Sequence, residues 1–163
     1  MSEQVTISTM LEAEHRWIDE RFEQFSRGLA MGLVKADTLQ EAASVLHRHI
    51  YLEEEVLFPE VEARGLEGPT AVMVQEHGDI CRFLNGITEL IGEGVGHARI
   101  QDSFKALRRL LEEHNVKEEG VLYPSADRLL NSAELVRRLK EANAPDGWAC
   151  RAHRGKGNSK HTN

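Results

Sequence analysis

The sequence is poor in the residues that mark a disulfide-stabilised, membrane-spanning or nucleic-acid-binding protein. Its 163 residues include only two cysteines, Cys81 and Cys150, which are too few for a disulfide framework and fit a reducing compartment. No stretch approaches the roughly 20 apolar residues that a membrane span needs, and residues 1–10 lack the basic start and apolar run of a signal peptide. Acidic residues outnumber basic ones by 27 to 20, which argues against nucleic acid as a partner because phosphate binding needs a basic face. We therefore expect a cytoplasmic protein that binds neither membrane nor nucleic acid.

Proline and glycine are also scarce, with 4 and 13 residues, and they occur in clusters that divide the chain into long segments. Apolar residues recur at helical spacing in these segments, and no segment alternates apolar and polar residues as a strand does. The sequence therefore predicts an all-α fold, an antiparallel up-down-up-down four-helix bundle. We expect four long helices and one short C-terminal helix at residues 8–29, 38–63, 70–91, 100–122 and 133–142, with Pro124 kinking or ending the fourth.

The last residues of the chain differ in composition from the rest. From Trp148 onward there are four basic side chains and no acidic one. We therefore divide the chain into a helical metal-binding domain, residues 1–145, and a basic, flexible C-terminal tail, residues 146–163, that could bind a protein partner. Trp148 is expected to pack on the end of the bundle. Cys150 and His153 lie three residues apart and would supply only half of a zinc site.

Histidine, by contrast, is abundant, with eight copies in a chain that has only 6% aromatic residues. Two of the eight begin matching segments with the pattern His-x3-Glu-Glu-x-Val-Leu-aromatic-Pro, which span residues 49–59 and 114–124. A Glu-His-x2-Ile pattern precedes each of these segments, at His15 in the first helix and at His77 in the third. The repeated order predicts a duplicated helical hairpin whose two copies pack about a pseudo-twofold axis.

The spacing within the repeat places histidines and glutamates on the core side of the helices. Residues at i and i+4 project from one face of a helix, so the histidine and first glutamate of each repeated segment point the same way. Burying unpaired carboxylates would cost on the order of several kcal/mol each, so bound metal would have to compensate for them. An isolated His-x3-Glu is usually an exposed polar pair, but its duplication argues for a metal site. The six predicted ligands are His15, His49, Glu53, His77, His114 and Glu118.

Six nitrogen and oxygen ligands are too many for one structural zinc ion, which takes four. Two metals would share the two glutamates as bridges. Each metal would also bind two histidines and a bridging oxo or hydroxo group, with an open position for a small molecule. Imidazole and carboxylate donors suit iron best, with manganese or zinc as less favoured alternatives. We therefore expect two non-haem iron ions as cofactors.

Several further residues lie close to the predicted ligands in the sequence. Glu54 and Glu119 follow the bridging glutamates and lie about 100° away around the helix, so they would support the ligands from behind or be exposed. Cys81 lies one turn after the histidine of the third helix and is expected to be a buried apolar residue, or a thiolate that reaches one metal. Tyr123 would mainly pack at a helix end, although it or Tyr51 could bring a phenol near the site.

The combination of these residues resembles the hemerythrin-like, HHE cation-binding family, in the branch with a symmetric H-HxxxE-H-HxxxE arrangement. The resemblance covers about residues 8–130 and includes the LFP and LYP endings of the repeated segments. It implies a four-helix bundle around a non-haem di-iron centre that binds, senses or turns over O2, NO or peroxide. The oxygen-carrying members have a fifth histidine where this chain has Cys81, and His-x4-Asp where it has His114-x3-Glu118. These departures argue against reversible oxygen carriage.

The resemblance leaves the activity open between two classes. One class is redox chemistry at the irons, such as peroxidase-like or catalase-like turnover, or reaction with NO and peroxide. The other class is iron binding for storage or sensing without turnover, in which the metal would control the stability of the bundle. Metal analysis would separate both classes from a metal-free interaction bundle.

Overall fold

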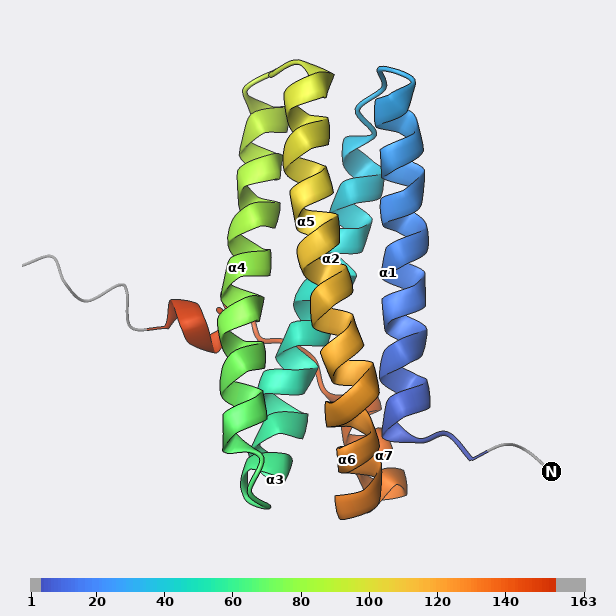
Figure 1. Cartoon of the computed structure of the whole chain (residues 1–163), viewed down its shortest axis with the longest axis vertical. Coiled ribbons are helices and arrows are strands. Elements are labelled where there is room, and N and C mark those ends of the chain that lie inside the picture. Colours follow the sequence, from blue (N-terminus) through green and yellow to red (C-terminus); the bar gives the residue numbers. More distant parts are fainter. Residues whose placement is uncertain (1–3, 155–163) are drawn as a thin grey trace, which may run out of the picture.

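The protein is a bundle of four long antiparallel helical rods (Figure 1). The computed structural model describes residues 4–154. Their elements, in chain order, are α1 (Ile7–Ala30), α2 (Ala36–Leu52), the π-helical turn η1 (Glu53–Leu57), α3 (Phe58–Glu62), α4 (Glu67–Gly92), α5 (His97–Lys117), the π-helical turn η2 (Glu118–Leu122), α6 (Tyr123–Leu129), α7 (Ser132–Glu141) and the short 3₁₀ turn η3 (Arg151–His153). No strand occurs among these residues, which confirms the predicted all-α bundle with a short C-terminal helix. No helix in the same range is long and apolar enough to cross a membrane.

Short polar signals begin and separate the helices. Thr6 begins α1 through a capping box, in which the Thr6 side chain accepts from the Thr9 backbone N–H and the Thr9 hydroxyl accepts from the Thr6 N–H. Asn131 caps α7 by accepting from a backbone N–H of its first turn. The tight turns before α2 and α4 use Gly32 and Gly65, whose φ angles of 75° and 93° lie in the left-handed region that favours glycine.

The core consists of two apolar clusters with a polar layer between them. One cluster includes Ile18 and Ile80, and the other includes Leu11 and Met73. In both α1 and α4, the members of the two clusters are therefore only two helical turns apart. His15 and His77 lie in sequence between the members of the two clusters on their helices. α7 packs in the second cluster, at the lower end of the bundle in Figure 1.

Neither proline of the repeated segments ends its helix. Pro124 does not end the fourth helix, as one of its two expected effects would require, because the rod continues through η2 into α6. The Tyr123 N–H bonds to the Glu118 carbonyl five residues back, and the Phe58 N–H bonds to the Glu53 carbonyl in the same way. This π-type turn takes up one extra residue. The proline that follows has no backbone N–H. It lies in the first turn of the next α-helical segment, where no helical hydrogen bond from that N–H is needed.

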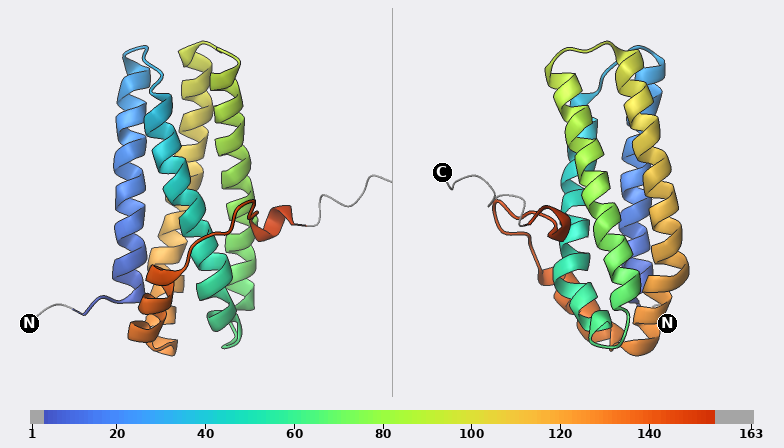
Figure 2. Two further views of the ribbon diagram at one scale, coloured as in Figure 1. Left: turned by 180° about the vertical axis from the view of Figure 1, so that it is seen from behind. Right: turned by 60° about the vertical axis from the view of Figure 1, so that its left-hand side comes forward.

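The segment of residues 143–154 crosses the outside of α2 and reaches α4 (Figure 2). Trp148 packs edge-on against His47 and Tyr51 of α2, with ring centroids 5.2 and 5.3 Å apart. Its indole N–H donates to Glu55 at 3.0 Å. Trp148 therefore lies on the side of the bundle, and the expectation that it would pack on the end was wrong.

The same segment packs closely on α4. Cys150 is buried in the first apolar cluster. Gly78 of α4 allows this approach, because a Cβ at that position would lie 2.6 Å from the Cβ of Ala152. The proposed tail thus begins, over residues 146–154, as a segment that contacts two helices, whereas residues 155–163 lie outside the described residues.

Candidate metal centre

Six buried side chains from the four rods meet in the polar layer. They are the residues that the repeat singled out: His15 of α1, His49 of α2, Glu53 of η1, His77 of α4, His114 of α5 and Glu118 of η2. None exposes more than 4% of its surface. Their ligand atoms form two groups that could each hold a metal ion and that share Glu118. One group is Glu53, His77, His114 and Glu118, and the other is His15, His49 and Glu118.

Each glutamate presents one oxygen to each pair of histidines. We name the two sides of the layer by their pairs: position A has His77 and His114, and position B has His15 and His49. Glu53 Oε2 lies 3.1 Å from His77 Nε2, and Glu53 Oε1 lies 3.5 Å from His49 Nε2. Glu118 Oε1 lies 2.9 Å from His114 Nε2, and Glu118 Oε2 lies 3.3 Å from His15 Nε2. Each of the two carboxylates therefore faces both histidine pairs.

The outward nitrogen of each of these four histidines bonds to a further carboxylate. The Nδ1–oxygen distances are 2.7–2.9 Å in the pairs His15–Glu119, His49–Glu14, His77–Glu54 and His114–Glu76. Such a bond fixes the orientation of the ring and directs its Nε2 atom toward a metal. His49–Glu14 lies within the first hairpin and His114–Glu76 within the second. The other two pairs join the hairpins, so these hydrogen bonds connect both halves of the bundle.

Two of these four supporting carboxylates were missed by sequence reasoning. Glu54 and Glu119 were expected to support the ligands or be exposed. Both bond to a histidine, but Glu54 is fully buried whereas the Glu119 side chain is 40% exposed. Glu14 and Glu76 were not considered, although both precede a histidine in the repeated Glu-His-x2-Ile pattern. Each reaches the histidine of the neighbouring helix, a contact that spacing along one helix cannot reveal.

A phenol completes the polar layer. The Tyr123 hydroxyl donates to Glu53 Oε1 at 2.5 Å and lies 3.0 Å from Glu118 Oε2, and the Nε2 atoms of position B lie 3.1 and 3.3 Å away. The π turn η2 places Tyr123 on the face that carries Glu118. A residue expected mainly to pack therefore lies among the predicted ligands. The other tyrosine, Tyr51, packs against Trp148 instead.

The buried charges of the layer stabilise one another. Burial and the Glu118 charge would raise the pKa of Glu53, but His49 and His77 lower it to about 2. Burial would lower the pKa of His49, but the carboxylates of Glu53 and Glu14 raise it to about 10. The layer is therefore built to hold positive charge, whether as protons or as metal.

Three atoms of position A show that a metal fits the residues. Glu53 Oε2, His77 Nε2 and Glu118 Oε1 are buried, and no group within residues 4–154 has hydrogen-bonding geometry to any of them. Buried polar atoms are rarely left in this state. They belong to a set of nitrogen and oxygen donors that lie within 4.8 Å of one another. Such a donor set suits iron, manganese or zinc.

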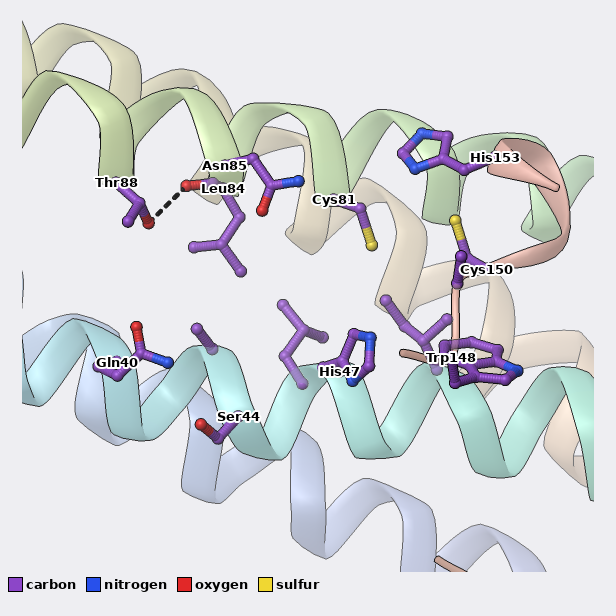
Figure 3. Close-up of a pocket in the computed structure, with 14 residues that line it drawn as sticks. Gln40, Ser44, His47, Cys81, Leu84, Asn85, Thr88, Trp148, Cys150 and His153 are labelled. Atoms are coloured by element: carbon purple, nitrogen blue, oxygen red, sulfur yellow. Dashed lines mark hydrogen bonds between the residues drawn. The ribbon is translucent and has the colours of Figure 1, made fainter. Parts of the chain in front are cut away.

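Cys81 lines a separate pocket. This pocket has a volume of about 500 Å³ and lies between α2 and α4, with Trp148, Cys150 and His153 along one side (Figure 3). Burial and the neighbouring Cys150 thiol raise the pKa of Cys81 to about 12, so it is a neutral thiol at neutral pH. Among the described residues, neither metal-binding group contains Cys81, Cys150 or His153.

Comparison with known proteins agrees with this geometry. The family model of the hemerythrin HHE cation binding domain matches residues 6–126, which include all the residues of positions A and B. No curated protein and no solved structure matches the chain. The family match spans most of the chain and confirms the resemblance seen in its repeated motifs. The chain therefore belongs to the hemerythrin HHE cation-binding domain family.

Proposed function

We propose that the protein binds two iron ions in the polar layer and uses them to bind, sense or turn over O2, NO or peroxide. The observation that carries this proposal is the placing of Glu53 and Glu118, each with one oxygen at position A and the other at position B. Membership of a cation-binding family supports it. The nitrogen and oxygen donors favour iron, with manganese and zinc as the alternatives.

The chain itself would contribute ligand orientation, water exclusion and a protonated phenol. The four supporting carboxylates fix the histidine rings, and the two apolar clusters limit the access of water from either side. Tyr123 keeps its proton inside the layer, because burial and the charges of Glu118 and Glu53 raise its pKa well above the usual range. Bound iron would supply the redox chemistry and the binding position for the small molecule.

Iron sensing or storage without turnover is the second candidate. It is favoured by a direct link between position A and the surface segment. The Arg151 backbone N–H donates to Glu54 Oε2 at 2.7 Å, and Glu54 Oε1 bonds to His77 Nδ1 at 2.9 Å. A change at His77 would therefore reach a segment that a protein partner could bind.

Anaerobic reconstitution with ferrous iron tests the proposal. We expect two iron ions per chain, one at each position, measured by metal analysis after removal of free iron. An iron content well below two per chain would contradict the dinuclear centre. A chain that binds only manganese or zinc under the same conditions would contradict the choice of iron.

Addition of O2, NO or peroxide to the iron-loaded protein separates the two candidates. Consumption of many equivalents of one of these molecules would support an enzyme. A spectral change that ends after one equivalent, together with altered accessibility of residues 143–154 to a protease, would support sensing of that molecule, which also belongs to the first candidate. No response to any of the three molecules would support the second candidate, iron storage or iron sensing.

A further inference from the structure

The two hairpins differ at a ring that faces the metal layer. Phe58 follows η1 in the first hairpin, Tyr123 follows η2 in the second, and both are fully buried. The Phe58 ring lies 5.7 Å from the ring of His77, and the Tyr123 ring lies 5.7 Å from the ring of His15. The pseudo-twofold axis thus relates the two rings, and the hydroxyl group is what distinguishes them.

The hydroxyl lies among the donor atoms of position B. Four of these atoms surround the Tyr123 oxygen at 2.5–3.3 Å, namely Glu53 Oε1, Glu118 Oε2, His15 Nε2 and His49 Nε2. A metal at position B would bind these same atoms. A metal at position B and the phenol hydroxyl therefore compete for the same space and for the same donor lone pairs.

Position A has no such group. Phe58 carries no hydroxyl, and its ring stacks face to face on the His77 ring with an interplanar angle of 6°. Three donor atoms of this position lack a hydrogen-bond partner among residues 4–154. A metal that enters position A thus satisfies donor atoms without a hydrogen bond among the described residues, and no hydroxyl opposes it.

We propose that Tyr123 makes metal loading sequential, with position A filled first and position B opposed by the phenol hydroxyl. This inference rests on the proposed dinuclear function. Binding at position B requires Tyr123 to give up the hydrogen bond that its hydroxyl donates to the buried Glu53 carboxylate and to leave its place 3.0 Å from Glu118 Oε2, a loss that binding at position A does not involve. Hydrogen bonds to charged groups are strong enough for the two dissociation constants to differ by about tenfold or more.

Calorimetric titration of the metal-free chain with ferrous iron, in the absence of oxygen, tests the proposal. The wild type should show two separate binding steps. Tyr123→Phe keeps the ring and removes the hydroxyl, so it should tighten the second step about tenfold and leave the first step unchanged. Phe58→Tyr is the matched control, because it places a hydroxyl at position A and should weaken the first step.

Two results would overturn the proposal and leave the dinuclear function standing. One is a second step in Tyr123→Phe that is unchanged or weaker, since the phenol would then be a bystander or a metal ligand. The other is equal affinity at both positions in the wild type. Fewer than two irons in the wild type and in both variants would overturn the function and the proposal together. If circular dichroism shows that Phe58→Tyr does not fold, the Tyr123→Phe titration decides alone.

Discussion

At the scale of single residues, the carboxylates behind the histidines decide how well the centre is organised. Glu14→Ala removes the carboxylate that bonds to His49 Nδ1 at 2.7 Å, which frees the ring to turn. We expect metal affinity to fall about 10–100-fold, the usual effect of losing such a partner. Competition with a chelator measures the change. Glu20→Ala, at an exposed position of the same helix, is the control, and equal affinity in both variants would contradict the prediction.

The bridging glutamates differ in their expected importance. The Glu118 oxygens lie 2.9 and 3.3 Å from a histidine of positions A and B, and those of Glu53 lie 3.1 and 3.5 Å away, so Glu118→Gln should lose more iron than Glu53→Gln. Glutamine keeps the size of the side chain and removes the charge that a metal requires. His47→Ala, on the Trp148 side of α2, should keep both irons. Metal analysis of the three variants checks the order, and two irons in Glu118→Gln would show that this residue is not a bridge.

The stability of the metal-free protein should be greatest between about pH 4.5 and 6.5. Folding lowers the pKa of Glu53 from 4.5 to about 2, so its stabilising effect is complete above pH 4.5 and is lost as the pH falls toward 2. Folding raises the pKa of His49 from 6.5 to about 10, so its effect is complete below pH 6.5 and is lost as the pH rises through 10. Urea unfolding of chelator-treated protein measures the profile. A free energy of unfolding that rises steadily through neutral pH would contradict it.

At the scale of elements, the two π turns decide which side chains reach the centre. Tyr123 was expected mainly to pack because the proline that follows it indicated a helix end. The five-residue hydrogen bond from Tyr123 to Glu118 changes the helical register and brings the phenol into the layer. Sequence periodicity could not predict the turn, because a proline fits a helix end, a kink and the start of a new helical segment equally well.

Sequence periodicity also could not predict where the surface segment of residues 143–154 packs. Its position depends on Gly78, which leaves room for Ala152, and on a match between Trp148 and the outer face of α2. These are contacts between parts of the chain that are far apart in sequence and follow no helical repeat. The composition of the segment indicated a basic tail but held no sign of where it would pack.

Arg151 should hold this segment on the bundle. Its guanidinium donates to the Glu54 carbonyl and to Glu62, the latter at 2.7 Å. Because the ion pair with Glu62 is about three-quarters buried, Arg151→Ala should lower the free energy of unfolding by about 1 kcal/mol and speed proteolysis of the segment. Urea unfolding and limited proteolysis measure these effects. Arg137→Ala, whose partners lie exposed on α7, is the control, and equal protease resistance in the two variants would contradict the prediction.

At the scale of the whole molecule, one layer of charge joins all four rods, so metal binding and folding should be linked. A ligand that binds only the folded chain stabilises it by about 2.7 kcal/mol when its free concentration is 100 times its dissociation constant. Iron should therefore raise the thermal unfolding midpoint, and a chelator should lower it again. Scanning calorimetry measures both shifts. Glu118→Gln should lose them, and an iron-independent midpoint in the wild type would contradict the link.

Much of the fold followed from the sequence because its information is repeated. Helical spacing of apolar residues predicted the four rods. The duplicated His-x3-Glu and Glu-His-x2-Ile patterns together singled out six side chains that the structure places in one layer. The sequence did not predict that Glu14 and Glu76 bond to histidines, because their histidine partners lie on other helices. Contacts of this kind depend on how the rods are rotated against one another, which no single helix encodes.

The difference between Phe58 and Tyr123 has a consequence for how such a centre can evolve. An assembly of two identical hairpins would copy every substitution across its axis, and would carry either two phenols or none. In this chain both hairpins are segments of one polypeptide, so a mutation on one side is not repeated on the other. Fusion of the two copies thus gives each half of the centre its own evolutionary history, while the shared carboxylates keep the halves in contact.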